Sequence, residues 1–389
     1  MKIALIVSEL NIRGGTHKQV LRLSEYLNAL GHNVTIYTKY YNLKGTYPEF
    51  ETLNVKSLYE GDWRKKIDSS KFLQKIKNKA HRIIDELKLV LLIDKDTDVL
   101  NFHDNGLEKV IIFSKFVFRK KSSLVWQIND ISGAFHVGVH SKSEDLPSHK
   151  KTRFYNEYAA KCVDEITVNV TKNAVRVKQC LGRDAKVFYC GVDVNEALEK
   201  HSYNIKDNTV RILSSGVFFP YRNYETLIDV VENLKNKNIN VHLDVIGATD
   251  RDKGYSDKII NLVKEKNLEN EITIWGQVDE AKYVELHNQA DMFTFININQ
   301  SWGLAVFEAM SCGLPVIVSE SVGAIELLHH NEDAIIVDPE NVEEISDIVL
   351  KLMNDKNYYN KISENAFNAV KEFTWDKLYS ERMLELFNK

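Results

Sequence analysis

The residue with the clearest chemical potential in this chain is a carboxylate inside an apolar segment. Residues 304–312 are apolar and compatible with a helix apart from Glu308, and Gly313 and Pro315 end that helix. A carboxylate in such a place is costly to bury unless hydrogen-bond donors meet it. Taken alone, the segment favours a helix with one exposed charge. The rest of the chain favours a carboxylate that binds a ligand.

Two glycine-containing loops have the properties of an anion site. Gly14 and Gly15 follow the first apolar strand and precede a helix, where backbone N–H groups can approach an anion closely. A second loop, from Gly216 to Asn223, also lies between a strand and a helix, and it contains Arg222. An arginine can hold a phosphate through two parallel hydrogen bonds, whereas a lysine cannot. The alternative interpretation of Arg222 is a solvated loop charge.

An alternation of strands and helices positions these residues. The chain opens with a strand over residues 2–7, a helix over 16–30 and a strand over 33–37. In the second half, the predicted strands are 211–215, 241–246, 271–275, 292–296 and 315–319, and the helices between them are 224–234, 256–266, 282–290 and 304–312. This pattern predicts an α/β protein with doubly wound parallel sheets, whose ligands bind at the carboxyl ends of the strands.

Size and composition narrow the class of protein. A chain of 389 residues predicts two domains, and a net charge of −4 gives no reason to expect nucleic acid as a partner. The four cysteines show no metal-binding spacing, and no other cluster indicates a metal, so we expect no metal and no cofactor. The first apolar run is too short for a signal peptide, and residues 89–93 are too short for a membrane span. The sequence therefore predicts a cytoplasmic protein.

Short motifs follow one another along nearly the whole chain. They are Gly14-Gly15, Leu30-Gly31-His32-Asn33-Val34, Cys190-Gly191-Val192-Asp193, residues 216–223, Asp244-Val245-Ile246-Gly247, Trp275-Gly276-Gln277-Val278, Ala290-Asp291, residues 300–318, Val322-Gly323-Ala324-Ile325-Glu326 and Phe373-Thr374-Trp375. In this order they resemble family 4 of the retaining, nucleotide-sugar-dependent glycosyltransferases, which have the GT-B fold. The resemblance implies two Rossmann-like domains that face each other across a cleft. We expect an acceptor domain over 1–195, a donor domain over 196–370, and a helix over 371–389 that returns to the first domain.

The resemblance also implies roles for residues of the second half. Glu308 matches the second glutamate of the family's E-x7-E motif, which binds the two ribose hydroxyls, and Gln300 stands where the first glutamate contacts the donor sugar. Arg222 matches one of two basic residues that bind the phosphates, and Val217 replaces the other. The other residues expected to bind the donor are Gly14, Gly15, Gly216, Asn223, Gln277, Trp302, Gly303 and Leu304.

Three positions depart from the family pattern. Besides Val217 and Gln300, the chain has Asn129-Asp130 where the family has His-Asp at the end of a strand. An amide at position 300 keeps hydrogen bonding but loses charge, which would cost roughly 1–2 kcal/mol and slow transfer by about 5- to 30-fold. We predict Arg222, Gln300, Asn129 and Asp130 as the catalytic set. His103 is a weaker candidate on the acceptor side, with His136 and His140 as alternatives.

The segment from Trp63 to Arg82 is a candidate membrane-binding surface. It contains eight basic residues and one acidic residue. Its apolar residues recur at helical spacing and extend to Ile84 and Leu87. A basic amphipathic helix suits an anionic membrane surface, where a lipid-linked acceptor would be found. The alternative is a helix that packs its apolar stripe on the sheet.

The sequence thus predicts a retaining, metal-independent glycosyltransferase that moves a sugar from a nucleoside diphosphate to a saccharide or lipid-linked acceptor in surface polysaccharide synthesis. The resemblance implies that the leaving phosphate accepts the acceptor's proton, so a pair of carboxylates at glycosidase spacing is not required. One alternative is a catalytically weak or inactive GT-B protein that binds a nucleotide sugar or a partner enzyme. A second alternative is a GT-B sugar-nucleotide epimerase, although the absent glutamate and histidine argue against it.

Overall fold

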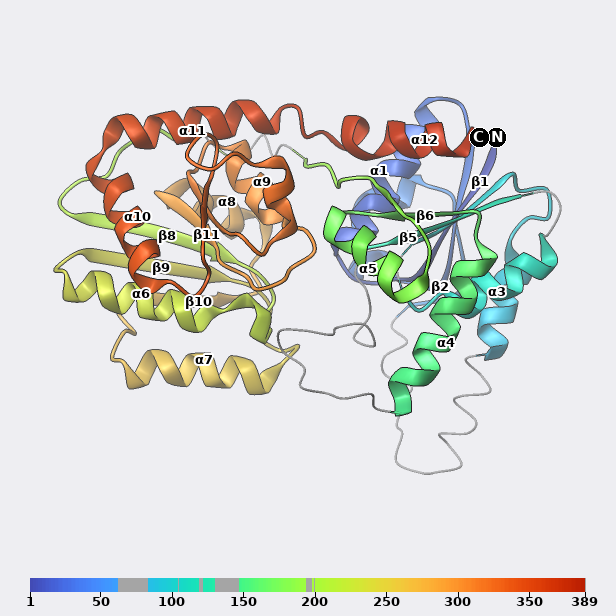
Figure 1. The fold of residues 1–389 in the computed structure, drawn as a ribbon, viewed down its shortest axis with the longest axis horizontal. Helices are drawn as coiled ribbons and strands as arrows, with labels where there is room; N and C mark the ends of the chain where they lie inside the picture. Colours follow the sequence, from blue (N-terminus) through green and yellow to red (C-terminus); the bar gives the residue numbers. More distant parts are fainter. Residues whose placement is uncertain are drawn as a thin grey trace. The chain divides into compact units, whose positions relative to one another are not determined.

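The computed structural model describes residues 1–61, 83–103, 105–118, 122–129, 147–193, 198 and 200–388. The chain forms two compact units, the first made of Met1–Gly191 and Trp375–Lys389 and the second of Val192–Thr374. Both chain ends therefore belong to unit 1, as Figure 1 shows. The segment from Trp63 to Arg82, together with Asp130, His136 and His140, lies outside the described residues.

Unit 1 is built on a seven-stranded parallel sheet with the strand order β3-β2-β1-β4-β5-β6-β7. The strands are β1 (Lys2–Leu10), β2 (Asn33–Tyr41), β3 (Val55–Glu60), β4 (Val99–His103), β5 (Ser123–Ile128), β6 (Glu165–Val168) and β7 (Lys186–Val187). The helices are α1 (Gly15–Ala29), residues 83–92, α3 (Glu108–Val117), α4 (Pro147–Cys162), α5 (Thr171–Leu181) and α12 (Glu381–Phe387), which a π-helical turn over Asp376–Ser380 precedes.

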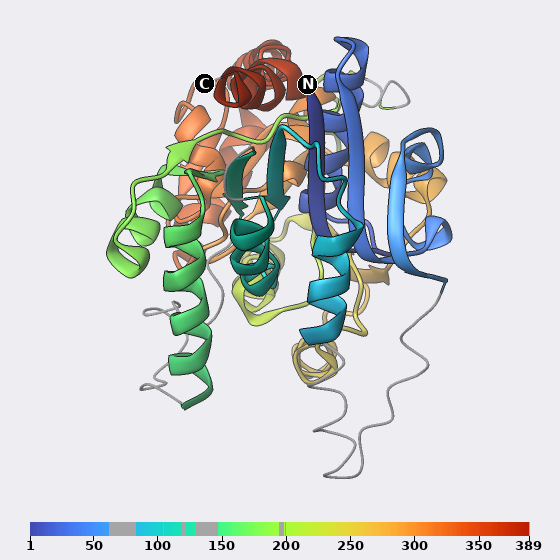
Figure 2. The same ribbon diagram turned by 90° about the vertical axis from the view of Figure 1, so that its right-hand side faces the viewer.

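The apolar strands of unit 1 explain this layering. All five residues of β4 are buried, as expected for a parallel strand covered on both faces. On one face, Ala4, Leu100 and Trp126 form a single core cluster with residues of helix 83–92, α3 and α4. The helices α3 and α4 pack against each other in this layer (Figure 2).

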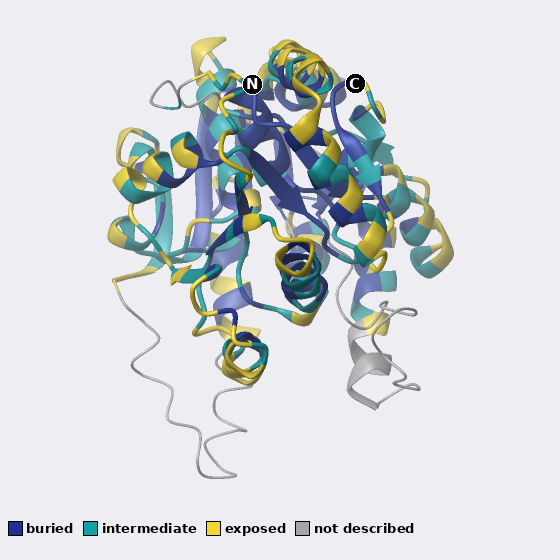
Figure 3. Ribbon diagram, turned by 90° about the vertical axis from the view of Figure 1, so that its left-hand side faces the viewer, coloured by how far each residue is buried: buried dark blue, intermediate teal, exposed yellow. Residues whose placement is uncertain are grey.

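Unit 2 repeats the architecture with a six-stranded parallel sheet in the order β10-β9-β8-β11-β12-β13. The strands are β8 (Thr209–Ser215), β9 (Asn240–Ile246), β10 (Ile272–Gly276), β11 (Met292–Phe295), β12 (Val316–Ser319) and β13 (Ile335–Val337). The helices are α6 (Tyr224–Asn236), α7 (Lys253–Glu265), α8 (Glu280–Gln289), α9 (Leu304–Ser311), α10 (Val342–Asn354) and α11 (Lys356–Val370), with short turns at Pro220–Arg222 and Gly323–Leu327. Figure 3 shows buried strands inside helices whose outer sides are exposed. The prediction of two Rossmann-like parallel-sheet domains is confirmed.

Strand order determines where a ligand can bind in each unit. In unit 1 the chain leaves β1 toward β2 and later returns to pair β4 on the other side of β1. In unit 2 the chain leaves β8 toward β9 and later returns to place β11 on the other side of β8. The loops that follow strands at such a reversal diverge and leave a crevice at the carboxyl ends. The expected sites therefore follow β1 and β4 in unit 1, and β8 and β11 in unit 2.

Candidate functional site

Arg222 lies at the strand reversal of unit 2 and contacts both loops that diverge there. Its Nη1 donates to Gln300 Oε1 at 2.9 Å, and its Nε donates to the Val217 carbonyl at 3.2 Å. The guanidinium carbon also lies 5.1 Å from the ring centre of Tyr221 and 5.7 Å from that of Phe295. These contacts hold a half-buried guanidinium at the carboxyl ends of β8 and β11, where an anionic ligand is expected.

Two glycines beside Arg222 stand at positions where a side chain would clash with neighbouring atoms. A Cβ at Gly216 would lie 2.5 Å from the guanidinium carbon of Arg222, and a Cβ at Gly247 would lie 1.9 Å from the Gly216 carbonyl oxygen. Backbone hydrogen bonds link the ends of three neighbouring strands, from Gly216 N to Ile246 O at 2.8 Å and from Gly247 N to Gly276 O at 2.9 Å. We call Gly216, Gly247 and Gly276 the glycine row. Because adjacent strands are about 4.8 Å apart, the row spans roughly 10 Å along the strand ends.

Gln300 and Asn223 have different roles at this position. The side-chain oxygen of Gln300 accepts a hydrogen bond from Arg222 Nη1. Asn223 adopts a left-handed backbone conformation with φ of 56°, and its buried amide donates to the Pro339 carbonyl at 2.7 Å. The Asn223 side chain therefore fixes the turn into α6, whereas Gln300 orients the arginine.

The helix α9 carries the predicted carboxylate. Glu308 is half-buried, and its Oε2 accepts a hydrogen bond from the Tyr283 hydroxyl at 2.8 Å. Gly303 is the N-cap of α9, and a Cβ there would lie 3.0 Å from the Phe295 ring. The first turn of any helix has N–H groups without intrahelical partners, so Gly303 and Leu304 present donors suited to an anion. Trp302 is 5% exposed and its ring packs on Phe307, so the Trp302 side chain is part of the hydrophobic core.

Gln277 lies at the other end of the glycine row. It is exposed and follows Gly276 at the carboxyl end of β10. The glycine row therefore extends along the strand ends from Arg222 toward Gln277. The structure brings Arg222, Gln300 and the glycine row together in one region of unit 2.

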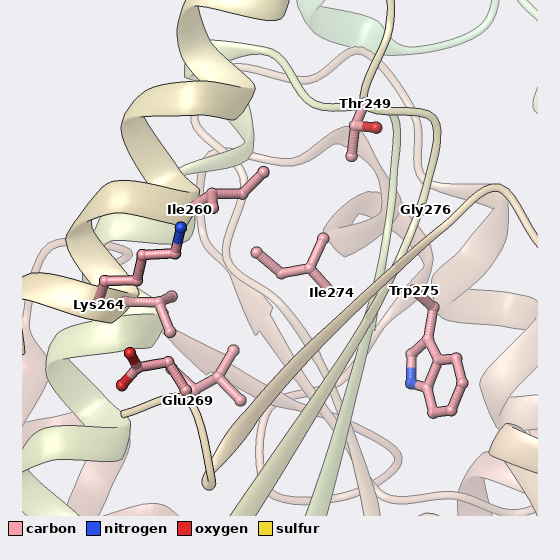
Figure 4. Close-up of a pocket in the computed structure, with 9 residues that line it drawn as sticks. Thr249, Ile260, Lys264, Glu269, Ile274, Trp275 and Gly276 are labelled. Carbon is pink, nitrogen blue, oxygen red and sulfur yellow. The ribbon is translucent and has the colours of Figure 1, made fainter. Parts of the chain in front are cut away.

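A cavity of about 380 Å³ lies beside this region, between α7 and β10. Its lining residues are Thr249, Ile260, Val263, Lys264, Glu269, Ile272, Ile274, Trp275 and Gly276. In Figure 4, Ile260 and Ile274 point into the space between the helix and the strand, whereas the Trp275 ring points away from it. Neither Arg222 nor Glu308 lines this cavity, so it is distinct from the predicted site.

In unit 1, Asn129 belongs to a buried network of amides and hydroxyls. Its Nδ2 donates to Thr16 Oγ1 at 3.0 Å and to Gln19 Oε1 at 2.6 Å, and its Oδ1 accepts from Gln127 Nε2 at 3.0 Å. Asn173 Nδ2 donates to its backbone carbonyl at 2.8 Å. Both amide hydrogens of Asn129 are therefore used inside unit 1. The network attaches the first turn of α1 to the end of β5.

That attachment also positions the first glycine loop. Gly14 is the N-cap of α1 and Gly15 is its first residue. The loop is further held by His17, whose Nε2 lies 2.8 Å from the Glu9 carbonyl oxygen, and a Cβ at Gly14 would lie 3.3 Å from the His17 ring. Asn129 thus supports the helix N-terminus at which Gly14 and Gly15 were predicted to meet an anion.

His103 ends β4 with its side chain fully buried. Neither ring nitrogen has a hydrogen-bond partner among the described residues. Burial lowers the pKa of His103 to about 3, because the charged imidazolium is penalised in an apolar surrounding. This side chain is therefore neutral at physiological pH, and it lies in the interior of unit 1.

Three contributors to the two regions were not predicted from the sequence: Tyr283, which contacts Glu308, and Thr16 and Gln19, which contact Asn129. Each is a single polar residue in a predicted helix, and no local motif distinguishes it. Within the described ranges, no group of three or more His, Cys, Asp or Glu side chains could hold a metal ion. The described helices also include none long and apolar enough to cross a membrane.

The comparisons with known proteins agree with this architecture. Residues 195–369 match the family model of glycosyl transferases group 1. An uncharacterised glycosyltransferase of Methanocaldococcus jannaschii is 25% identical over 394 residues, covering 98% of this chain and 96% of the relative.

Solved structures with the same fold span the whole chain. HepE of Anabaena, solved with UDP and glucose, aligns with a TM-score of 0.76 at 17% identity over 100% of both chains. Sucrose-phosphate synthase of Thermosynechococcus elongatus aligns with a TM-score of 0.73 at 16% identity, over 100% of this chain and 98% of that one. The chain therefore has the GT-B fold, and its residues 195–369 resemble the glycosyl transferases group 1 family.

Proposed function

We propose that this protein is a retaining glycosyltransferase that moves a sugar from a nucleoside diphosphate to a saccharide or lipid-linked acceptor without a metal ion. The observation that carries the proposal is the position of Arg222. Its guanidinium is held by Gln300 and Val217 at the strand reversal of unit 2, directly beside the backbone of Gly216. The match of residues 195–369 to the model of glycosyl transferases group 1 supports the same activity.

The proposed chemistry needs positioning and charge stabilisation more than a protein nucleophile. The bond between the anomeric carbon and the phosphate oxygen breaks, a bond from that carbon to the acceptor hydroxyl forms, and the hydroxyl proton passes to the leaving phosphate. Negative charge develops on the departing diphosphate, so a fixed guanidinium and the N–H groups at the start of α9 stabilise it. Arg222 supplies the charge, and Gly303 and Leu304 supply backbone donors.

Gln300 contributes in two ways to this proposal. Its amide can hydrogen-bond the donor sugar, and its oxygen already orients Arg222. Because the amide is neutral, it orients the guanidinium without cancelling its charge. We propose that Glu308 binds the ribose hydroxyls and that Gln277 lies near the base. The HepE structures contain UDP or UDP-glucose, which makes UDP-sugars the first donors to test.

The test is a donor screen with the purified protein. UDP-, GDP-, ADP- and dTDP-sugars are supplied with and without a membrane extract, and release of nucleoside diphosphate is followed. We expect release from one donor, and its loss in Arg222→Ala and Glu308→Ala. The matched control is Arg251→Ala, since Arg251 is an exposed arginine of the same unit. NMR of the product distinguishes retention from inversion at the anomeric carbon.

Two other outcomes would replace the proposal. Binding of a nucleotide sugar by calorimetry, with no release under any condition, would favour a catalytically weak or inactive binding protein. Conversion of the donor into another sugar nucleotide without an acceptor would favour an epimerase. In both cases the next experiment would give the chain the family's residues at the three positions that depart from its pattern, which are Val217, Gln300 and Asn129.

We propose further that unit 1 contacts the inner face of an anionic membrane. Helix 83–92 buries Leu89 and Val90 but leaves Ile84, Leu87 and Leu91 exposed, the last at 70%. The exposed apolar residues Ile84, Leu87 and Leu91 therefore lie on a different face of this helix from the residues that pack on the sheet. Among the described residues, eight of the thirteen exposed large hydrophobic side chains lie on helix 83–92, α3 and α4, which cover the same face of the sheet.

Vesicle flotation tests this surface. Leu91→Ser and Phe116→Ser should reduce binding to vesicles containing anionic lipid, while donor hydrolysis in solution stays unchanged. Val175→Ser is the matched control, because Val175 is 51% exposed but lies on α5. Equal binding of all three variants and the wild type would exclude the surface formed by helix 83–92 and α3, and absence of binding by the wild type would remove the membrane from the proposal.

A further inference from the structure

We infer that Tyr283 is a positioning residue that holds the Glu308 carboxylate in the orientation needed to bind the ribose hydroxyls of a nucleotide. The inference rests on the proposed function, because Glu308 is the residue proposed there to meet the ribose. In this role Tyr283 does not contact the ligand itself. It acts by fixing the Glu308 carboxylate, which does.

The contact joins two helices that are separate in the sequence. Tyr283 lies on α8 and Glu308 on α9, and the phenol donates to Glu308 Oε2 at 2.8 Å. Glu308 is half-buried on a helix whose Val306 and Phe307 are buried in the core. A carboxylate offers about four acceptor positions, and the phenol uses one of them. The hydrogen bond therefore orients the group without using up its capacity for two ligand hydroxyls.

The phenol is itself held in place by a stack of rings. The Tyr283 ring lies 4.0 Å from the His287 ring between centroids, His287 stacks on Phe293 at 6.2 Å, and Phe293 stacks on Phe295 at 6.2 Å. His287, Phe293 and Phe295 are almost completely buried. The stack thus runs from α8 into β11, beneath the strand end at which Arg222 lies. Moving the phenol would require repacking this core.

The phenol also keeps its proton over the useful pH range. Burial, with a further contribution from the Glu308 charge, raises the pKa of Tyr283 well above its ordinary value. The hydroxyl is therefore a permanent donor to the carboxylate. Loss of this donor would widen the range of orientations of the carboxylate, and ordering them on binding would weaken the affinity for the nucleotide.

The test measures discrimination between ribose and 2′-deoxyribose by calorimetry with the full chain. UDP, ADP and GDP are each titrated beside their 2′-deoxy counterparts, and the base that binds most tightly is used. We expect Tyr283→Phe to weaken the ribonucleotide by about 5- to 10-fold and the deoxynucleotide by no more than about 2-fold. Glu308→Gln should reduce the same ratio, and adding Tyr283→Phe to it should change the ratio no further.

The matched control is Tyr59→Phe. Tyr59 also donates its hydroxyl to a carboxylate, Asp85 Oδ1, at 2.7 Å, but in unit 1. This variant loses the same kind of bond, so it should leave the ratio of the two affinities unchanged. If Tyr283→Phe is unfolded at the assay temperature, Glu308→Asp replaces it, because the shorter side chain moves the carboxylate away from the phenol and keeps the charge. It should lower the ratio likewise.

The outcomes separate this inference from the function on which it rests. A ribonucleotide that binds the wild type while Tyr283→Phe keeps the wild-type ratio would overturn the positioning role alone. The wild-type ratio in Glu308→Asp would instead overturn the ribose contact on which that role rests. Absence of binding by all three nucleoside diphosphates would overturn the proposed function together with the inference. A lowered ratio, confined to the Tyr283 and Glu308 variants, would support both.

Discussion

The two units share one architecture but use their polar side chains in opposite ways. In unit 1, Asn129 is 8% exposed and its amide hydrogens are bonded to Thr16 and Gln19. In unit 2, Arg222 and Glu308 are only half-buried, at the corresponding end of the sheet. A buried polar group must be satisfied internally, whereas a partly exposed one keeps capacity for a ligand. The comparison supports the proposal that the polar residues of unit 2 bind the donor, whereas those of unit 1 fix the shape of its first glycine loop.

The largest expected effect is on catalysis by unit 2. Arg222→Ala removes the charge that we propose faces the leaving diphosphate, so kcat/KM should fall by about 10²- to 10³-fold. The free energy of unfolding should change by less than about 1 kcal/mol, because the side chain is half-buried. Arg222→Lys, which keeps the charge but loses the two parallel hydrogen bonds, should recover only part of the rate. Initial rates and urea unfolding check both statements, and a full rate in Arg222→Ala would contradict the comparison.

The largest effect in unit 1 should be on stability. Asn129→Leu removes hydrogen bonds from the buried side chains of Gln19 and Gln127, which should cost about 3 kcal/mol of unfolding free energy. Urea unfolding followed by tryptophan fluorescence measures this loss. Donor affinity at low denaturant should stay within about 2-fold of the wild type. A variant that is equally stable but has lost its donor affinity would place Asn129 among the binding residues after all.

Gln300→Glu should produce an intermediate effect that separates the rate of sugar transfer from the binding of the donor. A carboxylate near the donor sugar should raise kcat by about 5- to 30-fold. The same carboxylate would pair with Arg222, whose Nη1 lies 2.9 Å from the present oxygen, and donor KM should rise a few-fold. Measuring kcat and KM separately tests both. An unchanged kcat would show that the amide does not limit the rate.

The smallest expected effect is a pH dependence that belongs to unit 1. The pKa of His103 is lowered to about 3 in the folded protein, so below about pH 6.5 the unfolded state binds one more proton. The folded state therefore loses stability as the pH falls, by about 1.4 kcal/mol between neutrality and pH 5.5. Comparing urea unfolding at pH 7.5 and 5.5 in the wild type and in His103→Gln isolates this contribution. An identical pH dependence in both proteins would contradict it.

Much of the fold follows from local patterns in the sequence. The alternation of apolar strands and helices predicted the parallel sheets, and residues 304–312 were predicted as a helix where α9 spans Leu304–Ser311. The prediction of β2 was too short, because Thr38 to Tyr41 mix polar and aromatic residues at the end of the sheet. The three-residue strand β13 was not predicted, since a run that short has no distinctive period.

The sequence by itself determined which residue types stand at strand ends: glycines and an arginine after β8, a carboxylate on α9 and an amide after β5. Tertiary structure decided which of them meet. Arg222 contacts Gln300 because β11 pairs with β8, and Glu308 contacts Tyr283 because α8 and α9 come together. Asn129 is enclosed because α1 packs over the end of β5. Periodicity is a local property, whereas strand order and side-chain partners depend on contacts between residues far apart in the chain.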